Sequence, residues 1–156
     1  MNSKVTISVI IPCYNSEKTI TTCIKSVLAQ TDRVDEIIVV DDGSTDKSVN
    51  VVKDLFQSTS SLTKLILHEQ RNSGPSAARN KGIQLSISSH VAFLDSDDEW
   101  FLDHIYTVKS FLKKNPGYKM IATKYLSIPI KFTGEVLFKK MLFKKFRRLN
   151  LFIFTF

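Results

Sequence analysis

The chain has 156 residues, of which 43% are hydrophobic, and its formal net charge is +7. This length fits one domain, and the apolar content is enough for a packed core, which argues against disorder of the whole chain. The two cysteines, Cys13 and Cys23, stand ten residues apart with no CxxC pairing. That spacing argues against a disulfide framework or a zinc site and favours reduced thiols in the cytoplasm.

The positive charge is concentrated at the C-terminal end. Residues 131–156 hold seven lysines and arginines against Glu135 alone, a net charge of +6. The preceding 130 residues hold 15 basic and 14 acidic residues, a net charge of only +1. A basic surface for nucleic acid over the main body is therefore not supported, and no nucleic-acid partner is expected.

Apolar periodicity and turn residues divide the first 115 residues into alternating strands and helices. In chain order they predict a strand at 7–11, a helix at 17–30, a strand at 36–40, a helix from 46 to the Ser-Thr-Ser-Ser stretch at 58–61, a strand at 62–68, a turn at 72–76, a helix at 77–87, a strand at 90–94 and a helix at 101–113. Pro12 is expected to stop the first strand, and Ser16 to cap the first helix.

Strands that alternate with helices predict an α/β fold, a Rossmann-like core over about residues 5–115 with a mostly parallel sheet and right-handed crossovers. The first strand runs into Pro12-Cys13-Tyr14-Asn15 and lacks the glycine fingerprint of dinucleotide-binding enzymes. An NAD-dependent dehydrogenase is therefore disfavoured.

The most informative segment is Phe-Leu-Asp-Ser-Asp-Asp-Glu-Trp at 93–100, where a strand runs into three carboxylates within four positions: Asp95, Asp97 and Asp98. Carboxylates this close repel one another unless a positive charge lies among them, and a hard divalent cation, Mg²⁺ or Mn²⁺, that carries a phosphate fits that need. Two other polar strand ends precede this one, and ligands bind at the carboxyl ends of strands in open α/β sheets. The pattern predicts a metal-assisted nucleotide site.

Four separated motifs, SVIIPCYN at 8–15, VVDDGSTD at 39–46, NSGPSAARNKGI at 72–83 and FLDSDDEW at 93–100, resemble those of the family 2 glycosyltransferases, inverting enzymes with the GT-A fold. The resemblance implies transfer of a sugar from a nucleotide-diphosphate donor, first of all a UDP-sugar, to a carbohydrate or lipid-linked acceptor in polysaccharide or glycolipid synthesis. It covers about the first 115 residues.

For the first motif, the resemblance implies donor contacts at Pro12, Tyr14 and Asn15. Tyr14 would stack on the base above a turn shaped by Pro12. The alternative is a turn aromatic that packs on the sheet edge.

For the second motif, Asp41 and Asp42 are implied donor-binding residues, and Asp42 would accept a hydrogen bond from the base imide, since an ionised carboxylate can only accept. The alternative role is a turn or helix cap, which suits Asp46 better.

The third motif resembles a phosphate-side loop and helix. Gly74 permits close backbone approach, and Arg79, with Lys81 as a further candidate, either binds the donor or braces the acidic loop.

In the fourth motif, alternation along the strand end would point Asp95 and Asp97 the same way. Asp97 is the expected metal ligand and Asp98 its rival, while Asp95 and Ser96 are assigned to the donor. A turn-capping role for all three carboxylates is disfavoured, because capping needs only one.

The catalytic base cannot be assigned from the sequence. Glu135 is the only acidic residue after position 117, and its surroundings do not resemble the base motif of the family. We therefore expect a donor-binding domain over 1–117 and, over 118–156, the start of an acceptor part or a basic amphipathic tail, with the GT-A core truncated after the D-x-D region.

A catalytically silent nucleotide-sugar-binding or interaction module stays open as the alternative function. A nucleotidyltransferase is disfavoured because no glycine- and basic-rich loop follows the first strand.

The tail over 134–156 places apolar residues at helical spacing between basic ones. It predicts either an interfacial helix on anionic lipid or core of a further lobe. Its apolar runs are too short for a spanning helix of about twenty residues.

The apolar stretch near the N-terminus is too short for a signal-peptide core. The expected location is the cytoplasm, and the alternative is a peripheral position at the inner face of the membrane.

Overall fold

The computed structural model describes residues 5–118, 120–123 and 153–155. It contains β1 (Ile7–Cys13), α1 (Ile20–Leu28), β2 (Glu36–Asp41), α2 (Ser48–Ser58), β3 (Lys64–Glu69), α3 (Pro75–Leu85), β4 (His90–Phe93), α4 (His104–Lys114), β5 (Met120–Ile121) and β6 (Ile153–Thr155). The strands form one sheet in the order β3-β2-β1-β4-β6-β5. The predicted α/β alternation over the first 115 residues is confirmed.

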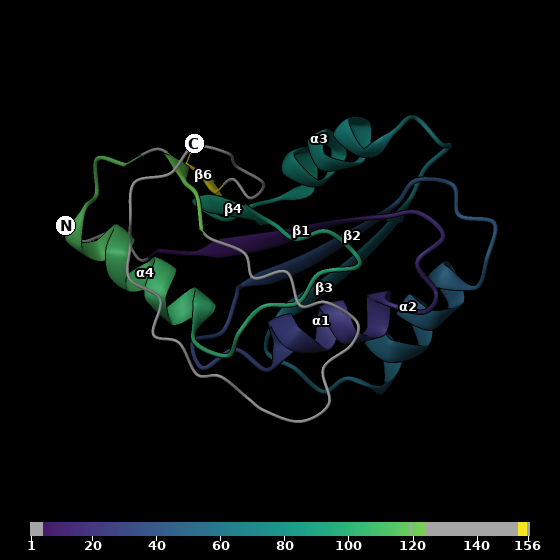
Figure 1. Cartoon of the computed structure of the whole chain (residues 1–156), viewed down its shortest axis with the longest axis horizontal. Helices are drawn as coiled ribbons and strands as arrows, with labels where there is room; N and C mark the ends of the chain where they lie inside the picture. The colour runs from purple at the N-terminus through teal and green to yellow at the C-terminus, as the bar shows by residue number, and fades with distance from the viewer. Residues whose placement is uncertain (1–4, 119, 124–152, 156) are drawn as a thin grey trace, which may run out of the picture.

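Four neighbouring strands, β3, β2, β1 and β4, are parallel, as expected for strands joined by helical crossovers. Figure 1 shows α3 on one face of the sheet and α1, α2 and α4 on the other. With both faces covered, every residue of β1, β2 and β4 is buried. The edge strand β3 is only partly covered.

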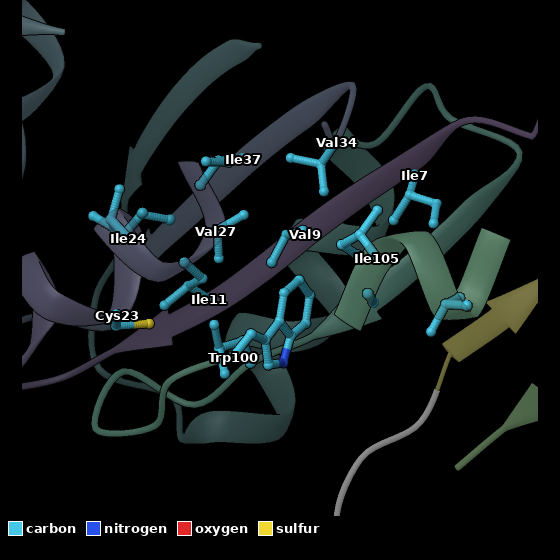
Figure 2. Close-up of a cluster of buried hydrophobic side chains, with 14 of the residues drawn as sticks. Ile7, Val9, Ile11, Cys23, Ile24, Val27, Val34, Ile37, Trp100 and Ile105 are labelled. Atoms are coloured by element: carbon cyan, nitrogen blue, oxygen red, sulfur yellow. The ribbon is translucent and has the colours of Figure 1, made fainter. Parts of the chain in front are cut away.

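The larger part of the core lies between the sheet and the three helices α1, α2 and α4. Ile7, Val9 and Ile11 point from β1 into this layer, where Ile24, Val27, Trp100 and Ile105 surround them (Figure 2). The alternate β1 residue Ile10 belongs to a smaller cluster on the α3 side. The period of two along β1 thus divides its side chains between the two layers.

Pro12 does not end β1, contrary to the prediction. It is buried within the strand and pairs with Val40 of β2. On its other side, β1 pairs with β4 only from Ile7 to Ile10, and the Ile10 carbonyl accepts the last bond, from the Leu94 amide. The backbone N–H and C=O groups of even-numbered residues in β1 are directed toward β4. An N–H at position 12 would therefore lie beyond the end of β4, and the proline costs no hydrogen bond of the sheet.

Ser16 does not cap the first helix with its side chain, so this prediction is also wrong. α1 begins three residues later than predicted, at Ile20, and the Ser16 carbonyl accepts the amides of Thr19 and Ile20. The Ser16 hydroxyl instead bonds the Tyr14 carbonyl and the Ser96 hydroxyl. The Ser16 hydroxyl thus bonds these two partners instead of an amide at the start of α1.

Two further strands, β5 and β6, extend the sheet beyond β4. β6 is antiparallel to both β4 and β5. Neither strand was predicted, and the tail over 134–156 lies outside the described residues except for 153–155. Within the described residues, no helix has the length and apolar character needed to span a membrane.

Candidate functional site

The carboxyl ends of β1, β2 and β4 and the N-terminal end of α3 enclose a hollow of about 530 Å³. Seven of the residues predicted from sequence line it: Pro12, Tyr14, Asp42, Arg79, Asp95, Ser96 and Asp97. Parallel strands end at the same edge of a sheet, which is why motifs up to 85 positions apart in the chain meet here. Tyr14 is half exposed and lines the hollow.

Three predicted site residues do not line this hollow: Asn15, Asp41 and Asp98. Asn15 has φ +49°, and its side-chain carbonyl accepts the Thr45 amide at 2.8 Å. Its own amide donates to the Ser44 hydroxyl at 2.9 Å, and that hydroxyl donates to the buried Asp41 carboxylate at 2.5 Å. Asp41 and Asn15 thus fasten the loop after β1 to the loop after β2, and this fixes the backbone that carries Tyr14.

Asp42 is almost fully buried and accepts three hydrogen bonds from the loop between β3 and α3. The donors are the Gln70 side-chain amide at 2.8 Å, the Ser73 amide at 2.9 Å and the Gly74 amide at 2.8 Å. Gly74 has φ +89°, a conformation that L side chains adopt at a cost. Asp42 therefore holds this loop in place while it also lines the hollow.

The helix-capping role considered for Asp42 belongs to Asp46. The Asp46 carboxylate accepts the amide of Ser48, the first residue of α2, at 2.9 Å, and also its hydroxyl. It accepts the Glu17 amide as well. Burial opposes ionisation of Asp46, but these hydrogen bonds outweigh it and lower the pKa of the carboxyl.

Arg79 contacts the acidic loop. Its guanidinium donates to the Asp95 carboxylate at 2.5 Å, and both side chains are partly exposed at the wall of the hollow. Of the two roles considered for Arg79, the observed contact is the bracing one. Lys81 is not among the residues that line the hollow.

Asp97 and Asp98 are exposed neighbours on a turn closed by the Asp98 amide and the Asp95 carbonyl. Partial loss of water and the charges of Asp97 and Asp95 raise the pKa of Asp98. Such repulsion favours a cation close by. Among the residues that the structure describes, no three His, Cys, Asp or Glu side chains form a metal cluster. The donor set nevertheless fits Mg²⁺ or Mn²⁺, which take one or two carboxylates and complete their shell with phosphate and water.

Cys13 is buried, lines the hollow and has a free thiol, and Cys23 is also a buried free cysteine. Burial, together with the charge of Asp41, raises the pKa of Cys13 to about 11. The thiol therefore stays protonated at neutral pH and is a poor nucleophile. The prediction of unpaired, reduced cysteines agrees with this environment.

Sequence reasoning missed the residues that fix the loops. Gln70 and Ser73 bond Asp42, and Ser16 bonds Ser96 at 2.7 Å. Gly43, with φ +76°, lies so close to the neighbouring loop that an added Cβ would come within 2.9 Å of the Asn72 amide nitrogen. A glycine after two aspartates signals a turn, but no spacing rule identifies its contact with residue 72.

Comparison with known families agrees with this geometry. The sequence model described as Glycosyl transferase family 2 matches residues 8–152. The chain belongs to glycosyl transferase family 2. An uncharacterized glycosyltransferase of Escherichia coli K12, YibD, is 44% identical over 99 residues, which are 64% of this chain and 28% of YibD. Glycosyltransferase GlyA of Streptococcus pneumoniae is 42% identical over 103 residues, 65% of this chain and 14% of GlyA. The chain thus spans under a third of these two relatives.

Solved structures place the fold in the GT-A class, as predicted. S. aureus TarS, residues 1–349, in complex with UDP superposes with a TM-score of 0.72 and 27% identity, over 84% of this chain and 38% of TarS. The same TarS fragment has been solved with UDP-GlcNAc. The mannosyltransferase PcManGT of Pyrobaculum calidifontis, in complex with GDP-Man and Mn²⁺, shares the fold with a TM-score of 0.68 at 24% identity, over 78% of this chain and 36% of PcManGT.

Proposed function

We propose that this family 2 chain binds a nucleotide-diphosphate sugar, a UDP-sugar first of all, for transfer with inversion to a carbohydrate or lipid-linked acceptor. The observation that carries the proposal is the convergence of Tyr14, Asp42 and Asp97 on one hollow of about 530 Å³. These three residues supply a stacking face, an acceptor for an imide N–H and a carboxylate for a cation. Structures of TarS with UDP and with UDP-GlcNAc support this choice of ligand.

Within this proposal, the base lies against Tyr14, over Pro12, and offers its imide to a free lone pair of Asp42. Asp95, held by Arg79, faces the ribose side, and Ser96 lines the hollow between Asp95 and Asp97 in the sequence. Asp41 and Asn15 act through the loops they fasten, since neither reaches the hollow.

Asp97, with Asp98 beside it, would hold a divalent cation, Mg²⁺ or Mn²⁺. That cation supplies charge neutralisation for the diphosphate leaving group. The structure of PcManGT with GDP-Man and Mn²⁺ supports a divalent metal in this fold. The role of the chain's own carboxylates would be to hold that cation at the strand ends, so that the diphosphate is oriented there.

The experiment is a thermal unfolding series with UDP, with and without Mn²⁺. A ligand that binds only the folded state stabilises it, by about 2.7 kcal/mol at a hundredfold excess over Kd. We expect UDP to raise Tm mainly when Mn²⁺ is present, and Asp97→Asn to remove that metal-dependent part without unfolding the protein. Asp54→Asn, which neutralises an exposed carboxylate on α2, is the matched control. An equal rise in Tm in chelator would remove the metal from the proposal.

The catalytically silent binding module is the second candidate. It is favoured by one observation: the described carboxylates at the hollow already have other roles, since Asp41 and Asp42 hold loops and Asp95 is paired with Arg79, so none of these three is assigned as the base for an acceptor hydroxyl. Release of UDP from UDP-GlcNAc, measured with and without oligosaccharide acceptors, separates the two. Acceptor-dependent release would exclude the silent module.

We further propose that the basic C-terminal residues contact anionic lipid, in line with a peripheral position at the cytoplasmic membrane face. The charge of +6 over residues 131–156 supports this, and vesicle binding measures it.

A further inference from the structure

Two serine hydroxyls join the loop that carries Tyr14 to the loop that carries Asp97. Ser16 Oγ lies 2.7 Å from Ser96 Oγ, across 80 positions of sequence. Ser16 Oγ also donates to the Tyr14 carbonyl at 3.1 Å. A serine hydroxyl has one proton to donate, so Ser16 accepts in the serine pair and Ser96 donates. The chain of contacts therefore runs from Ser96 through Ser16 to the backbone of Tyr14.

This chain of contacts joins two segments that both line the hollow. Tyr14 precedes Ser16 by two residues, and Asp97 follows Ser96 directly, while Tyr14, Ser96 and Asp97 all line the hollow. On the Ser96 side, the loop is also held by the Arg79 contact to Asp95 and by a weak bond from the Cys23 thiol to the Asp95 carbonyl. These contacts fix Asp95 to α3 and α1, but neither of them reaches the Tyr14 loop.

We propose that Ser96 is a positioning residue whose hydrogen bond to Ser16 sets the spacing between the aromatic face of Tyr14 and the carboxylate of Asp97. This inference rests on the proposed function, because it concerns a ligand that contacts both residues. A nucleoside diphosphate with its divalent cation binds tightly only when both can be engaged at once. A small change in the spacing between Tyr14 and Asp97 lowers the affinity for such a ligand, whereas the affinity for a ligand that contacts only one of them does not change.

The test compares a spanning ligand with one that reaches only the base end. Calorimetry gives Kd for UDP with Mg²⁺ and for uridine, which has no phosphate, on the wild-type chain and on Ser96→Ala. We expect Ser96→Ala to weaken UDP with Mg²⁺ by about three- to tenfold and to change uridine affinity by less than about twofold. Ser96→Thr, which keeps a hydroxyl, should restore the affinity for UDP with Mg²⁺.

The chain offers a matched control at the opposite end of the sheet. Thr6 and Ser89, which precede β1 and β4, form a second hydroxyl pair at 3.1 Å, so Ser89→Ala breaks the same kind of contact away from the hollow. It should leave both affinities unchanged.

Two results would overturn the role of Ser96: an unchanged affinity of Ser96→Ala for UDP with Mg²⁺, or an equal loss for uridine, which would indicate general loosening. A wild-type chain that binds neither ligand would instead overturn the proposed function, and this inference with it.

Discussion

At the scale of single residues, Asp42 and Tyr14 line the same hollow but differ in what they do for the fold. Asp42 is buried and accepts three hydrogen bonds, whereas Tyr14 is 50% exposed. A mutation at each position should therefore separate ligand binding from stability.

Tyr14→Ala should weaken UDP binding by about 1–3 kcal/mol, the range for loss of a base–aromatic stack, while Tm changes little. Asp42→Ala should also weaken binding, but it should lower the free energy of unfolding by about 2 kcal/mol because three part-buried donors lose a charged acceptor. Urea unfolding and calorimetry on the two variants measure both quantities. Equal stability of Asp42→Ala and wild type would show that the contacts to Gln70, Ser73 and Gly74 contribute nothing.

The sequence was sufficient to predict which polar residues gather at the strand ends, because Asp42, Asp95 and Asp97 each follow a strand of a parallel sheet. It was insufficient for the contacts among them. Ser16 could have capped a helix locally, and only the folded chain brings Ser96 within hydrogen-bond reach. Hydroxyl pairs carry no spacing signal, since serine is common in every loop.

At the scale of elements, α3 packs unusually closely on β1 through Gly82. A Cβ added there would lie 2.3 Å from Ile10 Cγ2, and Ile10 is fully buried. Gly82 is therefore required for helix–sheet packing, although glycine is a poor helix former.

Gly82→Ala should destabilise the protein by about 1–3 kcal/mol from overpacking, despite the better helix propensity of alanine. Asn80→Ala, at an exposed position of the same helix, should be neutral or stabilising by a few tenths of a kcal/mol. Denaturant unfolding of both variants measures the contrast. A stabilised Gly82→Ala protein would mean that α3 can move away from β1 at little cost.

The type of each helix and strand was predicted correctly through α4, but the end of β1 and the existence of β5 and β6 were not. Pro12 was expected to stop β1, and the reason it does not is that β4 ends before it, a fact about a neighbouring strand. The strands β5 and β6 also escaped prediction. A strand as short as Met120–Ile121 has too few residues to show a period, and its pairing with Ile153–Thr155 depends on the whole fold.

At the scale of the whole molecule, the uneven distribution of charge leads to a prediction about surfaces. Residues 131–156 carry +6, and the remaining 130 residues carry +1. Basic residues near an anionic membrane contribute about 1 kcal/mol each, and salt screens this attraction.

The chain should bind vesicles that contain phosphatidylserine at low salt and dissociate from them at high salt. It should not bind neutral vesicles. Lys144→Gln with Lys145→Gln should weaken the binding, whereas Lys113→Gln with Lys114→Gln, at the end of α4, should not. Co-sedimentation at two salt concentrations measures this. Equal effects of the two pairs would point to net charge alone, and salt-independent binding would favour an apolar contact.

Both ends of β2 carry a carboxylate that holds the α3 segment. At one end, Asp42, next to the last residue of the strand, accepts the Gly74 amide just before α3. At the other end, Glu36 accepts the Ile87 amide just after α3, at 3.0 Å, and also bonds Ser8 and Lys64. Burial opposes ionisation of Glu36, but these partners outweigh it and lower its pKa.

The consequence concerns chimeras between relatives of this family. An exchange that takes only the loop and helix over 70–87 would separate two backbone amides from the carboxylates that fit them. An exchange of 36–87 would instead keep both carboxylates with the amides that they accept, because β2 would be transferred together with α3 and its flanking loops.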